Sequence, residues 1–310
     1  MRFIEKGGFV FGVEVNDDLE IQHSSADNKR DLEKFMGSKY VQSRVGNSYI
    51  DVKTALDNGR WVLFSGTPCQ VEGLLKYLNN TNTSRLITVD VFCHGVGSPG
   101  FWKYYIEHNQ KKYHSRISRV YFREKTYGYN SACLALYFEN GKVSRKDHDN
   151  DQFWSAFSKC FIFRPSCYQC QFKKCSHLSD FTIGDYWETT NLPESYARAN
   201  GCSLLLLHSD KAKEVLASID DMIEKTAVDP FDALLVNGGH QTSMLITSSY
   251  KPPERDDFFE YTNNYGIEYA VKKYLPTSLP QKAKLMLKPL LHRLGILQFI
   301  KKMNTRFHSR

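Results

Sequence analysis

The stretch RPSCYQCQFKKCSHLSDFTIGDYW, which covers Arg164–Trp187, carries three of the eight cysteines of this chain. Cys167 and Cys170 stand at C-x-x-C spacing, and Cys175 follows five residues after the second of them. Because a tight turn brings two cysteines with this spacing to one side of the chain, their thiolates can bind one metal ion or one cluster. The same spacing also suits a disulfide or a thioredoxin-like redox pair, so all three interpretations stay open at this point.

The composition restricts the class of protein. Among 310 residues, 41% are hydrophobic and 24% are charged, which is typical of a globular chain with one large or two ordinary domains. No apolar run reaches the length of a membrane span, and the first residues, MRFIEKGGFVFGVEV, lack the apolar core of a signal peptide. We therefore expect a cytoplasmic protein. Because a reducing cytosol disfavours disulfides, clustered cysteines favour a metal and scattered ones a place in the core.

Two strand–turn–helix units precede the C-x-x-C stretch. Trp61–Phe64 is typical of a buried strand and runs into SGTPCQVEGLLKYL, where a helix begins near Cys69. Leu86–Phe92 is a second strand, followed by Cys93 in a glycine-rich turn and by a helix over Phe101–Lys111. If the strands are adjacent and parallel, both cysteines lie at one edge of the sheet, where open α/β folds bind ligands. A helix N-terminus favours a thiolate, so Cys69 is a metal ligand, a reactive thiol or merely a first-turn residue.

The first sixty residues predict a strand, two helices and a loop. Gly7–Val15 alternates as a strand does, and Asp27–Met36 and Tyr49–Asn58 have helical patterns. Between the helices, Gly37–Ser43 reads GSKYVQS. Its backbone N–H groups and its lysine could hold a phosphate, and a solvated turn is the alternative.

Further elements are predicted towards the C-terminus. Cys133, within an apolar alternation, and Cys202, at the start of an apolar strand, are expected in the core. The remaining predicted elements are the paired strands Arg116–Arg123 and Cys133–Phe138, a helix over Asp151–Phe163, a strand over Cys202–His208, and helices over Asp210–Lys225 and Asp256–Tyr274. Together they predict an α/β fold with a mixed sheet, strand–turn–helix units and a C-terminal helical region.

The positive charge of the chain belongs to its last thirty residues. From Gln281 to Arg310 the sequence has eight lysines and arginines and no carboxylate. The formal net charge of +7 therefore leaves the first 280 residues at −1. Leucines at helical spacing predict an amphipathic tail, which lies peripherally on the inner face of an anionic membrane, docks a partner, or packs on its own domain. Nucleic acid is not an expected partner, because no recognition motif accompanies the charge.

Four motifs in this order resemble a known family. They are VLFSGTPCQVEGLLKYL, TVDVFCHGVGSPGFW, RPSCYQCQFK and SDFTIGDYW, and GGFVFGVEV and GSKYVQS match upstream, so that the likeness covers Gly7 to Leu207. The family is the beta-subunit family of coenzyme F-420 (deazaflavin) hydrogenases and dehydrogenases. The resemblance implies an iron–sulfur flavoprotein that passes electrons between a deazaflavin, flavin or ferredoxin donor and an acceptor. Bacterial members often accompany enzymes of polysaccharide synthesis, which implies a role in surface-polysaccharide biosynthesis.

The resemblance also implies which residues hold the cofactors, although it assigns no catalytic residue. The positions that match the family's motif cysteines are Cys69, Cys93, Cys167 and Cys170, and four thiolates are what one 4Fe-4S cluster needs. The positions implied for FAD are Gly37, Ser38, Lys39, Tyr40, Gln42 and Ser43 in the loop, Ser65, Gly66, Thr67, Pro68 and Gln70 in the first turn, and His94 and Gly95 in the second.

The chain departs from the family pattern in three ways. The chain opens after the position of the family's N-terminal ferredoxin-like segment, so we expect this segment to be absent. His177 stands where members tend to have arginine, and Cys175 is outside the usual pattern. We therefore expect a short form, with a partial N-terminal family domain over residues 1–60, a C-terminal family domain over 61–275 and the basic tail over 281–310. The alternative function is a zinc-stabilised, non-redox accessory module of a polysaccharide pathway, because four thiolates also suit zinc.

Overall fold

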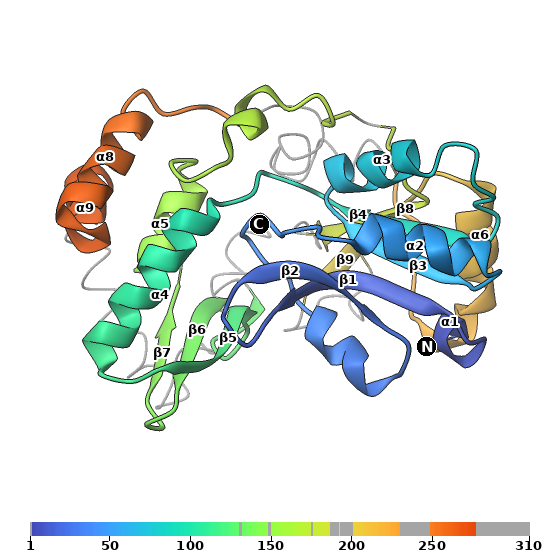
Figure 1. Cartoon of the computed structure of the whole chain (residues 1–310), viewed down its shortest axis with the longest axis horizontal. Helices are drawn as coiled ribbons and strands as arrows, with labels where there is room; N and C mark the ends of the chain where they lie inside the picture. The colour runs from blue at the N-terminus through green and yellow to red at the C-terminus, as the bar shows by residue number, and fades with distance from the viewer. Residues whose placement is uncertain are drawn as a thin grey trace. The chain divides into compact units, whose positions relative to one another are not determined.

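The computed structural model describes residues 2–129, 132–147, 150–174, 176–186, 192, 201–229 and 249–276. The chain divides into two compact units (Figure 1). Unit 1 comprises Met1–Pro99, Phe163–Glu188 and Gly201–Tyr250, and unit 2 comprises Gly100–Ile162, Thr189–Asn200 and Lys251–Arg310. The predicted family domains are a different division of the chain, and they stay a prediction.

Unit 1 is built on a mixed six-stranded sheet in the order β2-β1-β3-β4-β8-β9. The neighbours β1, β3, β4 and β8 run parallel, while β2 and β9 pair antiparallel at the two edges. The mixed α/β class is therefore confirmed. The strands are β1 (Phe9–Val15), β2 (Ile21–Ala26), β3 (Val62–Gly66), β4 (Leu86–Val91), β8 (Phe181–Tyr186) and β9 (Cys202–Leu207).

Helices cover both faces of this sheet. Successive side chains of a strand point to opposite faces, so Leu86 of β4 packs with α2 and α3 while Ile87 packs with Ala212 of α6. The helical spacing of Leu74, Leu75 and Leu78 predicts that all three lie on the inner face of the helix after β3. Leu74 and Leu78 are buried against the first face of the sheet, and Leu75 is partly buried against it. Figure 1 shows α2 and α3 beside β3 and β4. The described helices of unit 1 are α1 (Arg2–Glu5), α2 (Ser48–Asp57), α3 (Pro68–Tyr77) and α6 (Asp210–Ser218).

Unit 2 combines a three-stranded antiparallel sheet with helices. The strands β5 (Ile117–Glu124) and β6 (Cys133–Phe138) pair as predicted, and the turn with Gly141 at φ +80° leads into β7 (Val143–Lys146). Asp151 caps the first turn of α5 by accepting bonds from the backbone N–H groups of Phe153 and Trp154. The helices are α4 (Pro99–Tyr113), α5 (Gln152–Ser158), α8 (Arg255–Tyr265) and α9 (Ile267–Tyr274).

Several predicted elements differ in extent from the observed ones. β2 was not predicted, and the pattern over Asp27–Met36 forms only the short 3-10 helix η1 (Arg30–Phe35). The helix predicted over Asp256–Tyr274 is divided at Gly266, whose φ of +89° lies outside the helical region. The helix predicted from Asp210 ends at Ser218 and is followed by the 3-10 helix η5 (Asp220–Met222).

The two cysteines expected in the core have different environments. Cys133 on β6 is buried, which confirms the prediction. Cys202 is only partly buried, so its assignment to the core was wrong. The reason is its position at the start of β9, which is an edge strand and, among the described strands, pairs with β8 alone. Within the described ranges, no helix combines the length and the apolar character that crossing a membrane requires.

Candidate functional site

Two cysteine-bearing turns follow neighbouring strands at one edge of the unit 1 sheet. β3 and β4 are adjacent and parallel, as the sequence argument required, and Gly66 is in register with Asp90. The chain leaves β3 directly into α3, of which Cys69 is the second residue, and it leaves β4 into the turn that holds Cys93. Both turns therefore lie at the carboxyl edge of parallel strands, where α/β folds place their ligands.

The C-x-x-C segment lies against the turn that follows β4. The backbone N–H of Arg164 donates a 3.0 Å bond to the carbonyl of Val96, and Pro165–Gln169 then forms a 3-10 helix around Cys167. The N–H of Val96 in turn donates to the Cys167 thiol, which opposes the rise that burial causes in the pKa of this group. Two segments far apart in the sequence thus meet through two hydrogen bonds at Val96.

The four cysteines of the predicted ligand set interact electrostatically. Burial raises the pKa of Cys93 well above its usual range, and the thiols of Cys69, Cys167 and Cys170 raise it further, while the Lys173 ammonium lowers it. A negative charge on a neighbouring sulfur disfavours the charged form of the Cys93 thiol, which is why these thiols add to the effect of burial. Two other segments, the start of α3 and the C-x-x-C segment, therefore bring their sulfurs within electrostatic reach of Cys93.

The donor chemistry of this cluster fits a thiolate-ligated metal. Cysteine thiolates are the ligands of structural zinc and of iron–sulfur clusters, and four of them meet the need of either. The hydroxyl of Thr67 lies 3.1 Å from the Cys69 sulfur and adds a polar neighbour. Among the residues that the structure describes, no three His, Cys, Asp or Glu side chains are grouped closely enough to hold a metal ion. Cys175 lies outside the described residues, and the assignment of four ligands stays a prediction.

The loop predicted to hold a phosphate, Gly37–Ser43, lies beside the same turn after β4. The backbone N–H of Gly97 donates to the carbonyl of Tyr40, and the N–H of Gln42 donates to the carbonyl of Gly97, both at 2.9 Å. Val41 is buried and forms an isolated parallel bridge with Gly97. Gly37 has a φ of +78° and open space around its Cα, so this end of the loop is accessible.

A chain of hydrogen bonds joins this loop to the turn after β3. The side-chain amide of Gln70 donates to the Ser43 hydroxyl at 2.9 Å, and Ser43 lies 3.1 Å from His23 Nδ1. His23 Nε2 lies 3.2 Å from the carbonyl of Ser65. Burial lowers the pKa of His23 to about 4, against the opposing effect of the bond to Ser65. The neutral ring therefore donates from Nε2 to Ser65 and accepts from Ser43 at Nδ1. Sequence reasoning did not identify His23. Ile21 and His23 alternate along β2 and both are buried, and this spacing of two was the signal available in the sequence.

His23 makes the stability of the fold depend on pH. The unfolded chain binds a proton at a histidine pKa of about 6.5, whereas the folded chain does so only near pH 4. The contribution of the neutral ring is therefore complete above the unfolded pKa and is lost as the pH falls towards 4. We expect the unfolding free energy to fall by about 2 kcal/mol between about pH 7.5 and about pH 5. Urea unfolding of the parent and of His23→Gln at both pH values measures this, and an unchanged pH dependence in the variant would contradict it.

Lys39 is the only cation within the Gly37–Ser43 loop, and its side chain is hydrogen-bonded to nearby backbone carbonyls. Its ammonium donates to the carbonyls of Lys34 at 2.9 Å and Met36 at 3.1 Å. Burial lowers its pKa to about 8, and Glu14 opposes this shift. An ammonium has three N–H donors, so two carbonyl bonds leave a third for an anion.

His94 and Gly95, the positions that the resemblance implies in the second turn, pack against Phe163. The rings of His94 and Phe163 meet edge to face at 5.2 Å. A Cβ atom on Gly95 would lie 2.6 Å from the Phe163 ring, so only glycine leaves room for that ring. The His94 carbonyl accepts hydrogen bonds from Lys173 and Ser249. A role of these two residues in cofactor binding stays a prediction.

A buried polar cluster lies on the same strands, and sequence reasoning did not assign it a role. Asp90 of β4 accepts from the Thr182 hydroxyl at 2.5 Å and lies 2.8 Å from His177 Nδ1. Thr182 of β8 also lies 2.8 Å from His208 Nε2. His177 was noted only as a departure from the family pattern. The available signal for this cluster was Asp90, a carboxyl group within the largely apolar strand predicted over Leu86–Phe92.

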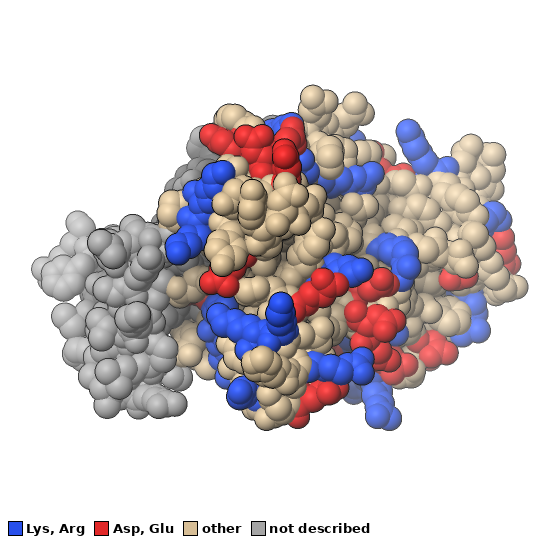
Figure 2. Space-filling view, turned by 60° about the vertical axis from the view of Figure 1, so that its left-hand side comes forward, with Lys and Arg blue, Asp and Glu red and all other residues tan. Residues whose placement is uncertain are grey.

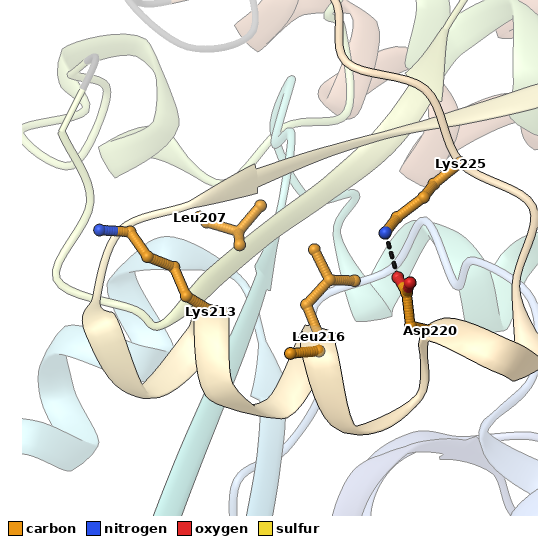
Figure 3. Close-up of a pocket in the computed structure, with 6 residues that line it drawn as sticks. Leu207, Lys213, Leu216, Asp220 and Lys225 are labelled. Carbon is orange, nitrogen blue, oxygen red and sulfur yellow. Dashed lines mark ion pairs between the residues drawn. The ribbon is translucent and has the colours of Figure 1, made fainter.

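A pocket of about 320 Å³ lies on the α6 side of the sheet (Figure 3). Leu207 and Leu216 form its apolar part, and Asp220 pairs with Lys225 at its rim. Lys213 and Ala217 complete the lining. None of the predicted cofactor positions lines this pocket, so it is separate from the cysteine cluster.

Positive and negative side chains are mixed on the face of the described surface that Figure 2 shows. Figure 2 shows lysine and arginine side chains interspersed with aspartate and glutamate side chains. This agrees with the charge of −1 that the sequence leaves for the first 280 residues. The basic tail over 281–310, with its predicted membrane contact, lies outside the described residues.

Comparisons with known proteins support the fold and the family. Residues 59–230 match the family described as the C terminus of the coenzyme F420 hydrogenase/dehydrogenase beta subunit. The fold is similar to that of a chain in the F420-reducing NiFe hydrogenase complex from Methanosarcina barkeri, with a TM-score of 0.50 and 18% sequence identity over 86% of this chain and 84% of that chain. No curated protein matches this chain. The family match spans more than half of the sequence and includes all four predicted ligand cysteines, so this chain belongs to the coenzyme F420 hydrogenase/dehydrogenase beta-subunit family.

Proposed function

We propose that this protein is an iron–sulfur flavoprotein oxidoreductase, which transfers electrons between a deazaflavin, flavin or ferredoxin donor and an acceptor. The observation that carries the proposal is the meeting of three cysteine-bearing segments at the carboxyl edge of β3 and β4. Thiolates from separate segments can bind one shared metal ion or cluster, whereas a C-x-x-C redox pair needs only its own two sulfurs. A role in surface-polysaccharide biosynthesis and a cytoplasmic location stay predictions.

The chain's own residues would position the cofactors. Cys69, Cys93, Cys167 and Cys170 would hold one 4Fe-4S cluster. The bond between Ser43 and Gln70 keeps the two proposed flavin-binding segments together, and a flavin there would lie beside the cysteine-bearing turns. When bound, the cluster and FAD supply the electron-transfer chemistry, and the protein supplies their orientation and electrostatic environment.

A zinc-stabilised module without redox activity is the second candidate. It is favoured by the donor set alone, because four thiolates form a closed tetrahedral zinc site as readily as they ligate iron. Zinc has no redox chemistry of its own, so such a site would stabilise the turns after β3 and β4 and nothing more.

Anaerobic purification of the full chain distinguishes the two candidates. The oxidoreductase is expected to contain iron, acid-labile sulfide and flavin, and to absorb in the visible. Zinc without iron, in a protein with no visible absorption, would overturn the oxidoreductase and support the zinc module. Metal analysis, flavin extraction and an absorption spectrum give the answer from one preparation.

Replacing Lys39 tests the flavin part of this proposal. Lys39→Ala removes the ammonium that could bind a flavin phosphate with its third N–H, and a charge-assisted bond of this kind is worth about 1.5–3 kcal/mol. We therefore expect the affinity for FAD to fall about tenfold or more. Titration of the flavin-free protein with FAD measures the change. Lys53→Ala is the matched control, because this exposed lysine of α2 pairs with Asp57 across one helical turn and lies outside the loop. Equal affinities in the parent and Lys39→Ala would remove the loop from the site.

A further inference from the structure

Lys173 is held beside the turn that carries Cys93. It follows Cys170 by three residues, and its Nζ donates a 3.2 Å hydrogen bond to the carbonyl of His94, which directly follows Cys93. The Ser249 hydroxyl donates to the same carbonyl. The hydrogen bond thereby directs a flexible lysine side chain to the backbone next to Cys93, one of the proposed ligands.

The next residue, Lys174, is directed elsewhere. Its Nζ lies 2.7 Å from Glu72 Oε1 on α3, in an ion pair whose glutamate side chain is 15% exposed. Of these two adjacent lysines, Lys173 is therefore the one directed to the Cys93 turn. The electrostatic interaction between Lys173 and the Cys93 thiol agrees with this placement.

A cation at this place has a defined effect on a cluster held by four thiolates. One-electron reduction adds one negative charge and, in its simplest form, moves no proton. A fixed positive charge nearby stabilises the reduced state more than the oxidised state, so it raises the reduction potential. Because the site is partly buried, solvent screens this interaction less than it would at the surface.

We propose that Lys173 is an electrostatic tuning residue, which raises the reduction potential of the site formed by the four cysteines. This inference rests on the proposed iron–sulfur function and extends it to Lys173, a residue to which the sequence analysis assigned no role. Lys173 would act through its charge, without ligating the metal.

Three variants separate the charge from the hydrogen bond. Lys173→Gln keeps a donor for the His94 carbonyl but removes the charge, whereas Lys173→Arg keeps both. Lys76→Met removes the same charge from an exposed position late in α3. The measurement is the midpoint potential of the anaerobically purified holoprotein in a dithionite titration with mediators, followed by absorption and electron paramagnetic resonance.

We expect Lys173→Gln to shift the reduction equilibrium about tenfold towards the oxidised state, which is about 59 mV for one electron. Lys173→Arg and Lys76→Met should each shift it less than about twofold. An unchanged potential in an iron-replete Lys173→Gln protein would overturn the tuning role and leave the proposed function intact. Loss of iron from Lys173→Gln would show that Lys173 stabilises the structure of the site, and it would also overturn the tuning role. A parent chain that binds no iron would overturn the inference together with the proposed function.

Discussion

Anaerobically purified Cys167→Ser and Cys170→Ser proteins should each lose most of the iron that the parent chain binds. A serine hydroxyl is a poor ligand for iron compared with a thiolate, and a cubane cluster needs four ligands. Both residues lie on the segment that is hydrogen-bonded to the turn after β4. Because these bonds fix the segment, a small rearrangement cannot bring another residue into the place of the lost ligand. Iron and sulfide analysis, with the visible spectrum, measures the loss. Cys69→Ser and Cys93→Ser should behave in the same way.

Cys202→Ser is the matched control for these variants. Cys202 is partly buried, as the four proposed ligands are, but it lies at the start of β9 and is outside the proposed ligand set. Its replacement should leave the iron content unchanged. Cys133→Ser is a weaker control, because a hydroxyl at this buried position destabilises the core by itself. Full iron content in Cys167→Ser and Cys170→Ser would refute the ligand assignment.

Asp90→Ala should destabilise the fold by about 3 kcal/mol. Asp90 is 1% exposed, and its carboxyl group accepts from Thr182 and pairs with His177. Alanine would leave both partners buried without their acceptor, and such groups retain the full cost of desolvation. Urea unfolding at neutral pH measures the loss of stability.

The position of Asp90 connects this loss of stability to the candidate site. It lies on β4 three residues before Cys93 and in register with Gly66 of β3. We therefore expect Asp90→Ala to retain less iron as well. Asp57→Ala is the control, because the exposed pair between Asp57 and Lys53 should contribute only about 0.5 kcal/mol. Equal unfolding free energies for Asp90→Ala and Asp57→Ala would show that the buried cluster does not stabilise unit 1.

Local patterns in the sequence were enough to predict the units that carry the site. The buried strands at Trp61–Phe64 and Leu86–Phe92, each followed by a glycine-containing turn and a helix, correspond to β3–α3 and β4–α4. Of the three leucines predicted on the inner face of this helix, Leu74 and Leu78 are buried and Leu75 is partly buried. Periodicity and turn residues report on neighbours within a few positions, and these features depend on such neighbours alone.

Elements that depend on distant contacts were predicted less well. β2 exists as an edge strand because β1 offers it a pairing partner, and its own sequence has only a short alternation. The pattern over Asp27–Met36 had enough helical character for only a short 3-10 helix. For β2, tertiary pairing decided a structure that the local pattern alone did not predict.

The sequence by itself determined the strand–turn–helix units, the C-x-x-C spacing and, through its motifs, the family of this protein. Only the tertiary structure decided that the Gly37–Ser43 loop pairs with Gly97, that Val96 contacts the C-x-x-C segment, and that His177 reaches Asp90. The physical reason is that strand order and register set contacts between segments far apart in the chain, and no local periodicity encodes them. Spacing along the chain therefore predicted which residues could be ligands, and the pairing of β3 with β4 placed the turns that carry Cys69 and Cys93 at one edge of the sheet.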